Sequence, residues 1–245
     1  MGAAGRAVRK RGASVKYVIV NGDDFGASHG INLGILEAHQ RGILTSTSLM
    51  VDTPWSEEAA LLSRTVPDLD VGLHADLAGG IGTPAADRSD SGGGRAELER
   101  QIRRFEELMG CPPTHLDSHH NVHRDPRLFR AFVDAARRYE LPLRGHSPVR
   151  CLSTFYGQWG GVTHLEQISV PSLLRMLETE VRPGVTELGC HPGYLDPGFR
   201  SGYSVEREAE LRTLCDPSLR HVLTEQHIRL VRFRDLPSLQ FDRSA

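Results

Sequence analysis

The sequence predicts an α/β fold made of parallel β/α units, arranged either as a barrel or as an open, doubly wound sheet. Predicted strands alternate with predicted helices from residue 17 to residue 233, and no internal repeat or domain boundary interrupts them. The chain has 245 residues, of which 39% are hydrophobic, which is enough to bury one core. We therefore expect residues 15–245 to form a single domain, preceded by a flexible basic tail over residues 1–14.

The first predicted element is a buried strand over residues 17–20, a β-branched run that ends in a polar Asn-Gly-Asp-Asp segment at 21–24. A helix follows from about residue 30, with its apolar side chains on one stripe, and ends at Gly42. The same criteria predict strands at 44–51 and 71–74 and a helix at 56–63.

Glycine content and helical periodicity characterise the middle of the chain. Residues 78–94 hold six glycines in seventeen positions and predict a flexible loop, either a linker or an active-site lid. Apolar residues from Leu98 to Met109 recur at i, i+4, i+7 and i+11, as on one face of a helix. A strand is predicted at 114–118, followed by a helix that begins at Pro126.

The last third completes the alternation. Residues 141–144 predict a short strand, and the glycine-containing segment 145–166 is expected to be irregular. The apolar spacing from residue 173 to residue 181 predicts a helix. The closing elements are a strand at 185–190, helices that begin at Val205 and Pro217, and a strand at 228–233.

The composition excludes several classes of protein. Charged residues make up 24% of the chain and its formal net charge is −2, so we expect no nucleic-acid partner. No apolar run reaches the roughly 18 residues of a membrane span, so we expect no membrane partner. The four cysteines are widely spaced, which argues against a disulfide framework or a thiolate zinc site and predicts a cytoplasmic location.

Polar residues follow four of the predicted strands. Asp23 and Asp24 follow the first, His74 the third, a histidine-rich segment at 115–123 the fourth, and His191 a late one. In β/α folds the carboxyl ends of the strands build one active face, so we expect these residues to converge. Each also has a structural interpretation, since aspartates cap helices and form turns, and a lone histidine after a strand is commonly structural.

The histidine-rich segment has four histidines in nine residues. Alternation along a strand puts His115, Asp117 and His119 on one face. Interleaved apolar residues argue against a solvated histidine loop, the alternative interpretation. Neutral imidazole is a common ligand for divalent metals, so the segment predicts a metal-binding or catalytic role. When the residues at all four strand ends are taken together, two histidines and one aspartate make a three-ligand site with open positions, as in catalytic metal centres.

Four motifs, in this order, resemble the YdjC-like carbohydrate deacetylases, the chitooligosaccharide deacetylase family. The family's N-A-D-D-F-G motif is matched at residues 21–26 with glycine at position 22, its G-x-H at 72–74, its P-T-H-x-D-S-H at 113–119, and its C-H-P at 190–192. The resemblance runs from about residue 17 to residue 233. It implies a distorted β/α barrel with parallel strands and hydrolysis of an N-acetyl group on a sugar.

The resemblance also implies roles for individual residues. The motif match makes Asp24, His74 and His119 the ligands of one divalent metal cation. It makes Asp23 the catalytic base and His191 the catalytic acid.

Arg144 stands where the family often has an arginine that orients the base.

The family's cation is often described as Mg²⁺, whereas two histidine ligands favour Zn²⁺. Segments 78–94 and 145–166 depart from the family pattern. They would line the sugar site in such a fold, which leaves the sugar open.

The implied reaction releases acetate from an N-acetylated amino sugar or oligosaccharide, which is the expected partner of the chain. An alternative is another mononuclear metallohydrolase, an amidohydrolase or a phosphoesterase, on a non-sugar substrate; phosphoesterases commonly use two metals. A second alternative is a non-catalytic sugar-binding module, which would be expected to lack Asp23 or His191. The oligomeric state stays open, with a homodimer among the expected forms.

Overall fold

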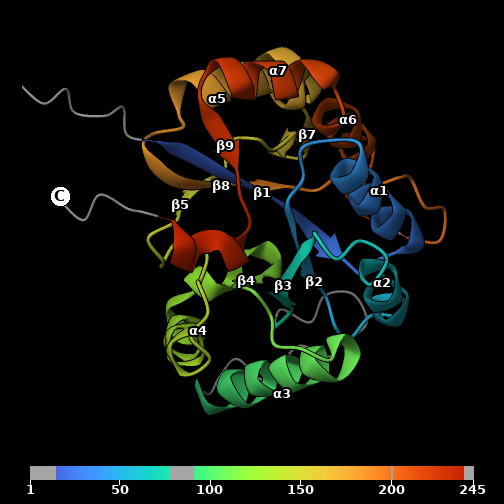
Figure 1. The fold of residues 1–245 in the computed structure, drawn as a ribbon. Coiled ribbons are helices and arrows are strands. Elements are labelled where there is room, and N and C mark those ends of the chain that lie inside the picture. The colour runs from blue at the N-terminus through green and yellow to red at the C-terminus, as the bar shows by residue number, and fades with distance from the viewer. Residues whose placement is uncertain (1–14, 78–90, 200, 240–245) are drawn as a thin grey trace, which may run out of the picture.

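Seven parallel strands curl into one sheet, and helices cover its outer face (Figure 1). This computed structural model describes residues 15–77, 91–199 and 201–239. The strand order is β4-β3-β2-β1-β8-β5, with β9 added beside β1, and the ends of this path stay unpaired with each other. The predicted α/β fold, a distorted β/α barrel with parallel strands, is confirmed.

The strands of this sheet are β1 (Lys16–Phe25), β2 (Ser46–Leu49), β3 (Asp70–Ala75), β4 (Leu116–Ser118), β5 (Arg150–Leu152), β8 (Gly184–Cys190) and β9 (Ile228–Leu230). β1 is central: it pairs with β8 on one edge and, on the other, first with β9 and then with β2. Two strands therefore share one edge of β1. A separate antiparallel pair consists of β6 (Gln158–Trp159) and β7 (Val162–Thr163).

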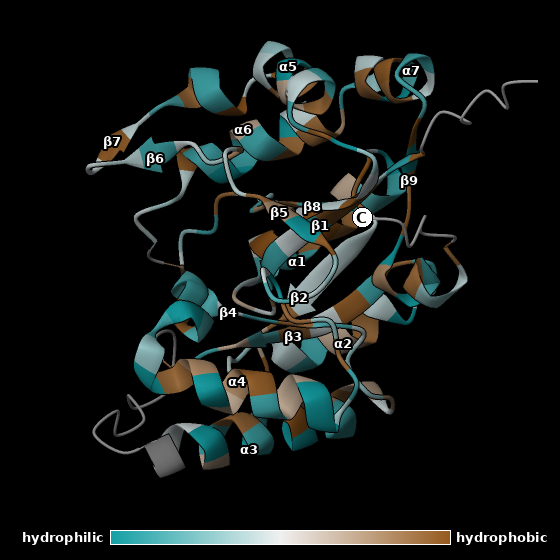
Figure 2. Cartoon of the chain, turned by 90° about the vertical axis from the view of Figure 1, so that its left-hand side faces the viewer, coloured by the Kyte–Doolittle hydropathy of each residue, from teal (hydrophilic) through white to brown (hydrophobic). Residues whose placement is uncertain are grey.

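The α-helices are α1 (His29–Gln40), α2 (Ser56–Ser63), α3 (Ser91–Met109), α4 (Pro126–Arg138), α5 (Val170–Thr179), α6 (Val205–Leu214) and α7 (Pro217–Glu225). Short 3-10 helices are η1 (His119–Arg124), η2 (Leu165–Ile168) and η3 (Phe233–Ser238). Figure 2 shows α3 and α4 below the curled sheet, next to β3 and β4, and α5, α6 and α7 above it. No helix within the described ranges is long and apolar enough to cross a membrane.

Alternation along β1 divides the core into two clusters. Val18 and Val20 face the surrounding helices and join the large apolar cluster there. Ile19 faces the barrel interior, where it packs in a small cluster with Val149, Val185, Val231 and Phe233. This small cluster fills the barrel on the side where β1 begins, so the polar residues further along the strands lie above an apolar floor.

Most predicted elements are present, with corrections at their limits. β1 continues through the predicted polar loop to Phe25, because β8 pairs with it as far as Gly22 and β2 pairs with it again at Phe25. Residues 141–144 form only an isolated bridge between Leu143 and Leu116. The segment predicted to be irregular, 145–166, contains three short strands. The last predicted strand ends at Leu230, and η3 begins at Phe233.

The predicted loop 78–94 is corrected at its end. Residues 91–94 belong to the first turn of α3. Gly94 is buried there, and a Cβ atom on it would lie 2.5 Å from a methyl group of Leu128 in α4, so a glycine permits the close approach of the two helices. The rest of this loop, 78–90, and the predicted basic tail, 1–14, lie outside the described residues.

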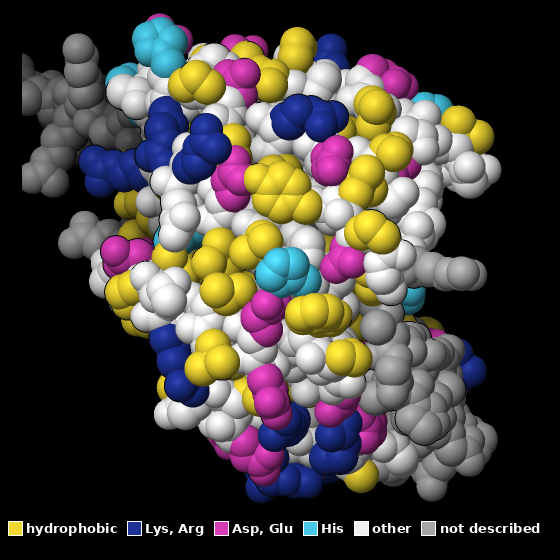
Figure 3. All heavy atoms as spheres, turned by 90° about the vertical axis from the view of Figure 1, so that its right-hand side faces the viewer, with side chains coloured by type: hydrophobic (Ala, Val, Ile, Leu, Met, Phe, Trp, Pro, Cys, Tyr) yellow, Lys and Arg dark blue, Asp and Glu magenta, His cyan; other side chains and the backbone are white. Residues whose placement is uncertain are grey.

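Acidic and basic side chains are interspersed on the face shown in Figure 3. Ion pairs of this kind occur around α3, where Arg100 contacts Asp52 and Glu97, and Arg104 contacts Glu57 at 3.2 Å.

Candidate active site

Two adjacent carboxylates at the end of β1 point into the barrel interior. In a regular strand Asp23 and Asp24 would face opposite sides of the sheet. Here the pairing register with β2 shifts between Gly22 and Phe25, and Asp24 has a φ of 69°. This bulge turns Asp24 back toward the side that Asp23 faces. Both residues are buried, with 5% and 3% of their surface exposed.

Asp24 meets two histidines from neighbouring strand ends. Its Oδ1 atom lies 3.2 Å from Nε2 of His74, on β3, and 3.1 Å from Nδ1 of His119, the first residue of η1. Two imidazole nitrogens and one carboxylate oxygen therefore converge within 4.8 Å of one another. This donor set fits a divalent cation, with imidazole favouring a transition ion.

His74 is held by a second carboxylate. Its Nδ1 atom lies 2.7 Å from Oδ1 of Asp117, on β4, so that Nε2 is directed toward Asp24. Burial lowers the pKa of His74, but Asp117, Asp24 and Asp23 together outweigh burial and raise that pKa well above its usual value. A histidine ligand whose other nitrogen contacts a carboxylate is the usual arrangement in metal sites.

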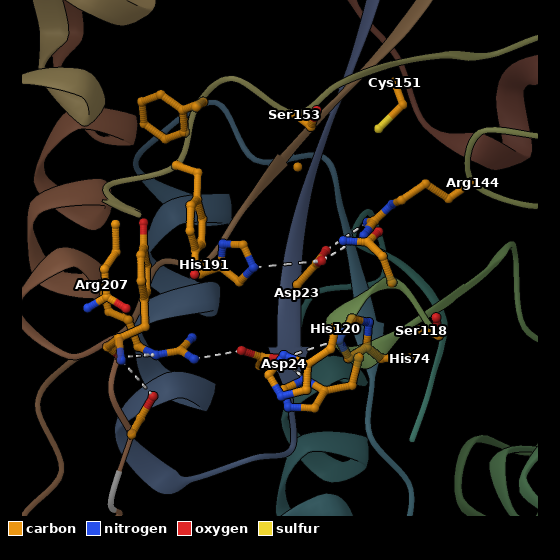
Figure 4. A pocket seen from close by; sticks show the side chains of 18 of the residues that line it. Asp23, Asp24, His74, Ser118, His120, Arg144, Cys151, Ser153, His191 and Arg207 are labelled. Carbon is orange, nitrogen blue, oxygen red and sulfur yellow. Dashed lines mark hydrogen bonds and ion pairs between the residues drawn. The ribbon is translucent and has the colours of Figure 1, made fainter. Parts of the chain in front are cut away.

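Asp23 is clamped by Arg144 (Figure 4). The guanidinium donates to both carboxylate oxygens at 2.7 Å, and it also contacts Asp117 and Glu187 at 2.7 Å each. Burial raises the pKa of Asp23, but Arg144 outweighs it and leaves that pKa lowered. With this lowered pKa, Asp23 is ionised at neutral pH. Burial raises the pKa of Glu187 to about 7, although Arg144 opposes the shift.

His191 lies on the other side of Asp23, directly after β8. Its Nε2 atom is 3.9 Å from Oδ2 of Asp23, and its Nδ1 atom is 3.8 Å from Oε1 of Glu210. Glu210 is fully buried and also accepts hydrogen bonds from the His191 backbone N–H and the Tyr203 hydroxyl. Burial lowers the pKa of His191, but Glu210 more than compensates and raises it.

Arg207, Tyr203 and Glu210 come from α6 and the turn before it, a region without a recognisable motif. Arg207 donates to Oδ2 of Asp24 at 2.6 Å. Tyr203 stacks on Tyr156, with ring centroids 4.7 Å apart, and its edge meets the His191 ring. The sequence interpretation missed these residues because charged and aromatic positions on a helix predict a solvated or apolar face, not a site.

The aspartates, His74, His119, Arg144 and His191 all line one cavity of about 790 Å³. The structure thus brings together all six residues that the sequence predicted. His115 does face the same side of β4 as Asp117, but it stacks on Phe233, with ring centroids 3.9 Å apart, and lies away from the cavity. The expected convergence at the carboxyl ends of the strands is confirmed, while the chemical role of each residue stays a prediction.

Known proteins resemble this chain over most of its length. The YdjC-like protein family model matches residues 17–225. A carbohydrate deacetylase of Geobacillus stearothermophilus is 37% identical, covering 91% of this chain and 99% of its own. A chitooligosaccharide deacetylase of Serratia marcescens is 35% identical, with coverage of 90% and 99%. A crystal structure from Enterococcus faecalis matches with a TM-score of 0.79 and 28% identity, covering 91% of this chain and 99% of that one.

Proposed function

The chain belongs to the YdjC-like protein family, and on this basis we propose that it removes the N-acetyl group from an N-acetylated amino sugar or oligosaccharide and releases acetate. The observation that carries the proposal is geometric. Asp24, His74 and His119 surround one point, and Asp23 and His191 face each other beside it.

Asp24, His74 and His119 would hold one divalent cation, Zn²⁺ or Mg²⁺. Such a cation, when bound, polarises an amide carbonyl and lowers the pKa of water. The two imidazoles favour Zn²⁺, and the carboxylate with open positions also admits Mg²⁺.

Asp23 is the proposed general base. Because Arg144 keeps its pKa low, it is ionised and ready to accept a proton at neutral pH. The same bidentate contact fixes the direction of the carboxylate, so Asp23 accepts the proton of the attacking water at a defined position in the cavity.

His191 is the proposed general acid. Glu210 raises its pKa, which keeps the imidazole protonated to a higher pH than an ordinary histidine. Its Nε2 atom faces the side of the cavity where Asp23 lies, so the proton is available to the departing amine of the sugar.

The tyrosine pair beside His191 suits a sugar ring. Tyr156 is 39% exposed, lines the cavity and is backed by Tyr203, with an interplanar angle of 7°. The face of a tyrosine ring provides apolar contact area, while its hydroxyl stays polar. A cavity of about 790 Å³ lies in the usual range for small-molecule sites.

A dinuclear phosphoesterase is less well supported. The described residues include a second set of possible metal ligands, Asp23, His74 and Asp117. This set shares His74 with the proposed cation site. Arg144 already contacts both of its carboxylates. These residues therefore suit an ion-pair network better than a second cation. A non-catalytic module is less well supported too, since both Asp23 and His191 face the site.

The test is acetate release from a panel of N-acetylated monosaccharides and oligosaccharides, with protein reloaded with Zn²⁺ or Mg²⁺. We expect acetate and free amine in equal amounts. Asp23→Asn should lower turnover by about 10²–10⁴-fold with normal metal content, whereas Asp134→Asn, on the outer helix α4, should not. No acetate from any sugar, or substantial turnover by Asp23→Asn, would contradict the proposal.

A further inference from the structure

Arg207 lies at the start of α6, outside the four sequence motifs, and only 6% of its surface is exposed. Its Nη2 atom donates to Oδ2 of Asp24 at 2.6 Å, and its Nε atom donates to the Tyr203 carbonyl at 3.0 Å. The guanidinium carbon lies 5.8 Å from the centre of the Tyr203 ring. These contacts hold the guanidinium in one orientation against the carboxylate.

The two oxygens of Asp24 therefore have different surroundings. Oδ1 faces His74 and His119, at 3.2 and 3.1 Å, whereas Oδ2 is bound by Arg207. Figure 4 shows Arg207 and His74 on opposite sides of Asp24. A carboxylate can bind a cation through one oxygen or through both. Here a buried, charged hydrogen bond competes for the second oxygen.

We propose that Arg207 is a positioning residue that reserves Oδ2 of Asp24, so that the carboxylate offers only Oδ1 to a cation. The inference rests on the proposed function, because it assumes that Asp24, His74 and His119 hold a divalent cation. A cation with three single-atom protein ligands keeps positions open for water and for the substrate carbonyl. The positive charge of Arg207 also weakens cation binding, since it offsets the charge of Asp24.

A purely structural role for Arg207 makes a different prediction. If it only fastened α6 to β1, its loss would lower the free energy of unfolding but leave the cation's affinity and hydration unchanged. The hydration of a bound cation therefore distinguishes the two roles, and it can be measured without any substrate.

The experiment uses the full chain, stripped of metal, with Mn²⁺ as the probe. Calorimetry measures the affinity, and water-proton relaxation counts the water molecules on the bound ion. The variants are Arg207→Met, Arg207→Lys and a matched control, Arg212→Met, which removes a largely exposed arginine from the same helix. Circular dichroism checks that each variant folds.

We expect the wild-type chain, Arg207→Lys and Arg212→Met to bind Mn²⁺ alike. Arg207→Met should bind it about tenfold more tightly or better, because a like charge is removed from a buried site, and with about one water fewer, because Asp24 then binds through both oxygens. If Arg207→Met does not fold, Arg207→Gln replaces it with the same expectation.

Wild-type affinity and hydration in a folded, charge-neutral variant would overturn the inference. Failure of the wild-type chain to bind one Mn²⁺ is a distinguishable result, since it contradicts the cation site of the proposed function itself.

Discussion

The replacement of Glu210 by glutamine tests how the site sets the pKa of its proposed acid. Glutamine keeps the size of the side chain and a carbonyl that can accept the hydrogen bond of the His191 backbone N–H. It removes the negative charge near Nδ1 of His191. Tyr203, which donates to Glu210 in the wild type, can instead accept a hydrogen bond from the new amide.

The size of the effect follows from one distance. Oε1 of Glu210 lies 3.8 Å from Nδ1 of His191. At about 4 Å and an effective dielectric constant of about 20, two unit charges interact by about 4 kcal/mol. One pKa unit corresponds to about 1.4 kcal/mol. Because the imidazole is 24% exposed and partly screened by water, we expect its pKa to fall by about one to two units.

The assay is kcat/KM for acetate release as a function of pH. The acid must be protonated, so activity is lost as pH rises through the pKa of His191. Glu210→Gln lowers that pKa, and the alkaline limb of the profile should move to lower pH by the same one to two units. Glu208→Gln, a more exposed glutamate on α6, should leave the limb in place. A folded, active Glu210→Gln enzyme with an unmoved alkaline limb would refute the reasoning.

Three further predictions concern stability, protons and substrate. Arg144→Met leaves three buried carboxylates without their cation, and urea denaturation should show a loss of about 3–5 kcal/mol in the free energy of unfolding; Arg130→Met on the surface should cost less than about 0.5 kcal/mol. Although burial lowers the pKa of His74, its carboxylate partners raise it well above the usual value. Cation binding near neutral pH should therefore release about one proton and tighten as pH rises; calorimetry in two buffers that detects no proton would contradict this. Tyr156→Ala should raise KM about tenfold, the scale of one aromatic contact, and change kcat less; an unchanged KM would exclude it from the sugar site, and Tyr194→Ala is the control.

Local patterns account for the elements that the sequence predicted correctly. The helix at 56–63 ends before Pro67, and α4 begins at Pro126 with Asp125 as its cap. Both predictions were correct because proline position and capping are short-range signals. The fold then brought the strand ends together, so polar residues after predicted strands were a reliable guide to the site. Four separate motifs could be assigned to one cavity for this reason.

Long-range pairing explains what the sequence did not reveal. Asp23 and Asp24 lie in a strand rather than in the expected polar loop, because β1 pairs with distant strands. Their carboxylates are buried against Arg144 and Arg207, which are 121 and 183 residues away. A buried charge on a helix, such as Glu210, looks like a solvated one until its partner is located. Only the three-dimensional structure shows which charges are paired inside the barrel.

Anomalous diffraction from crystals of the Zn²⁺-loaded protein tests the central claim most directly. We expect one anomalous peak at about 2.0–2.2 Å from Oδ1 of Asp24, Nε2 of His74 and a ring nitrogen of His119, with Arg207 still on the other oxygen of Asp24. A crystal without a peak at these three residues, or with the ion held by other side chains, would contradict the claim.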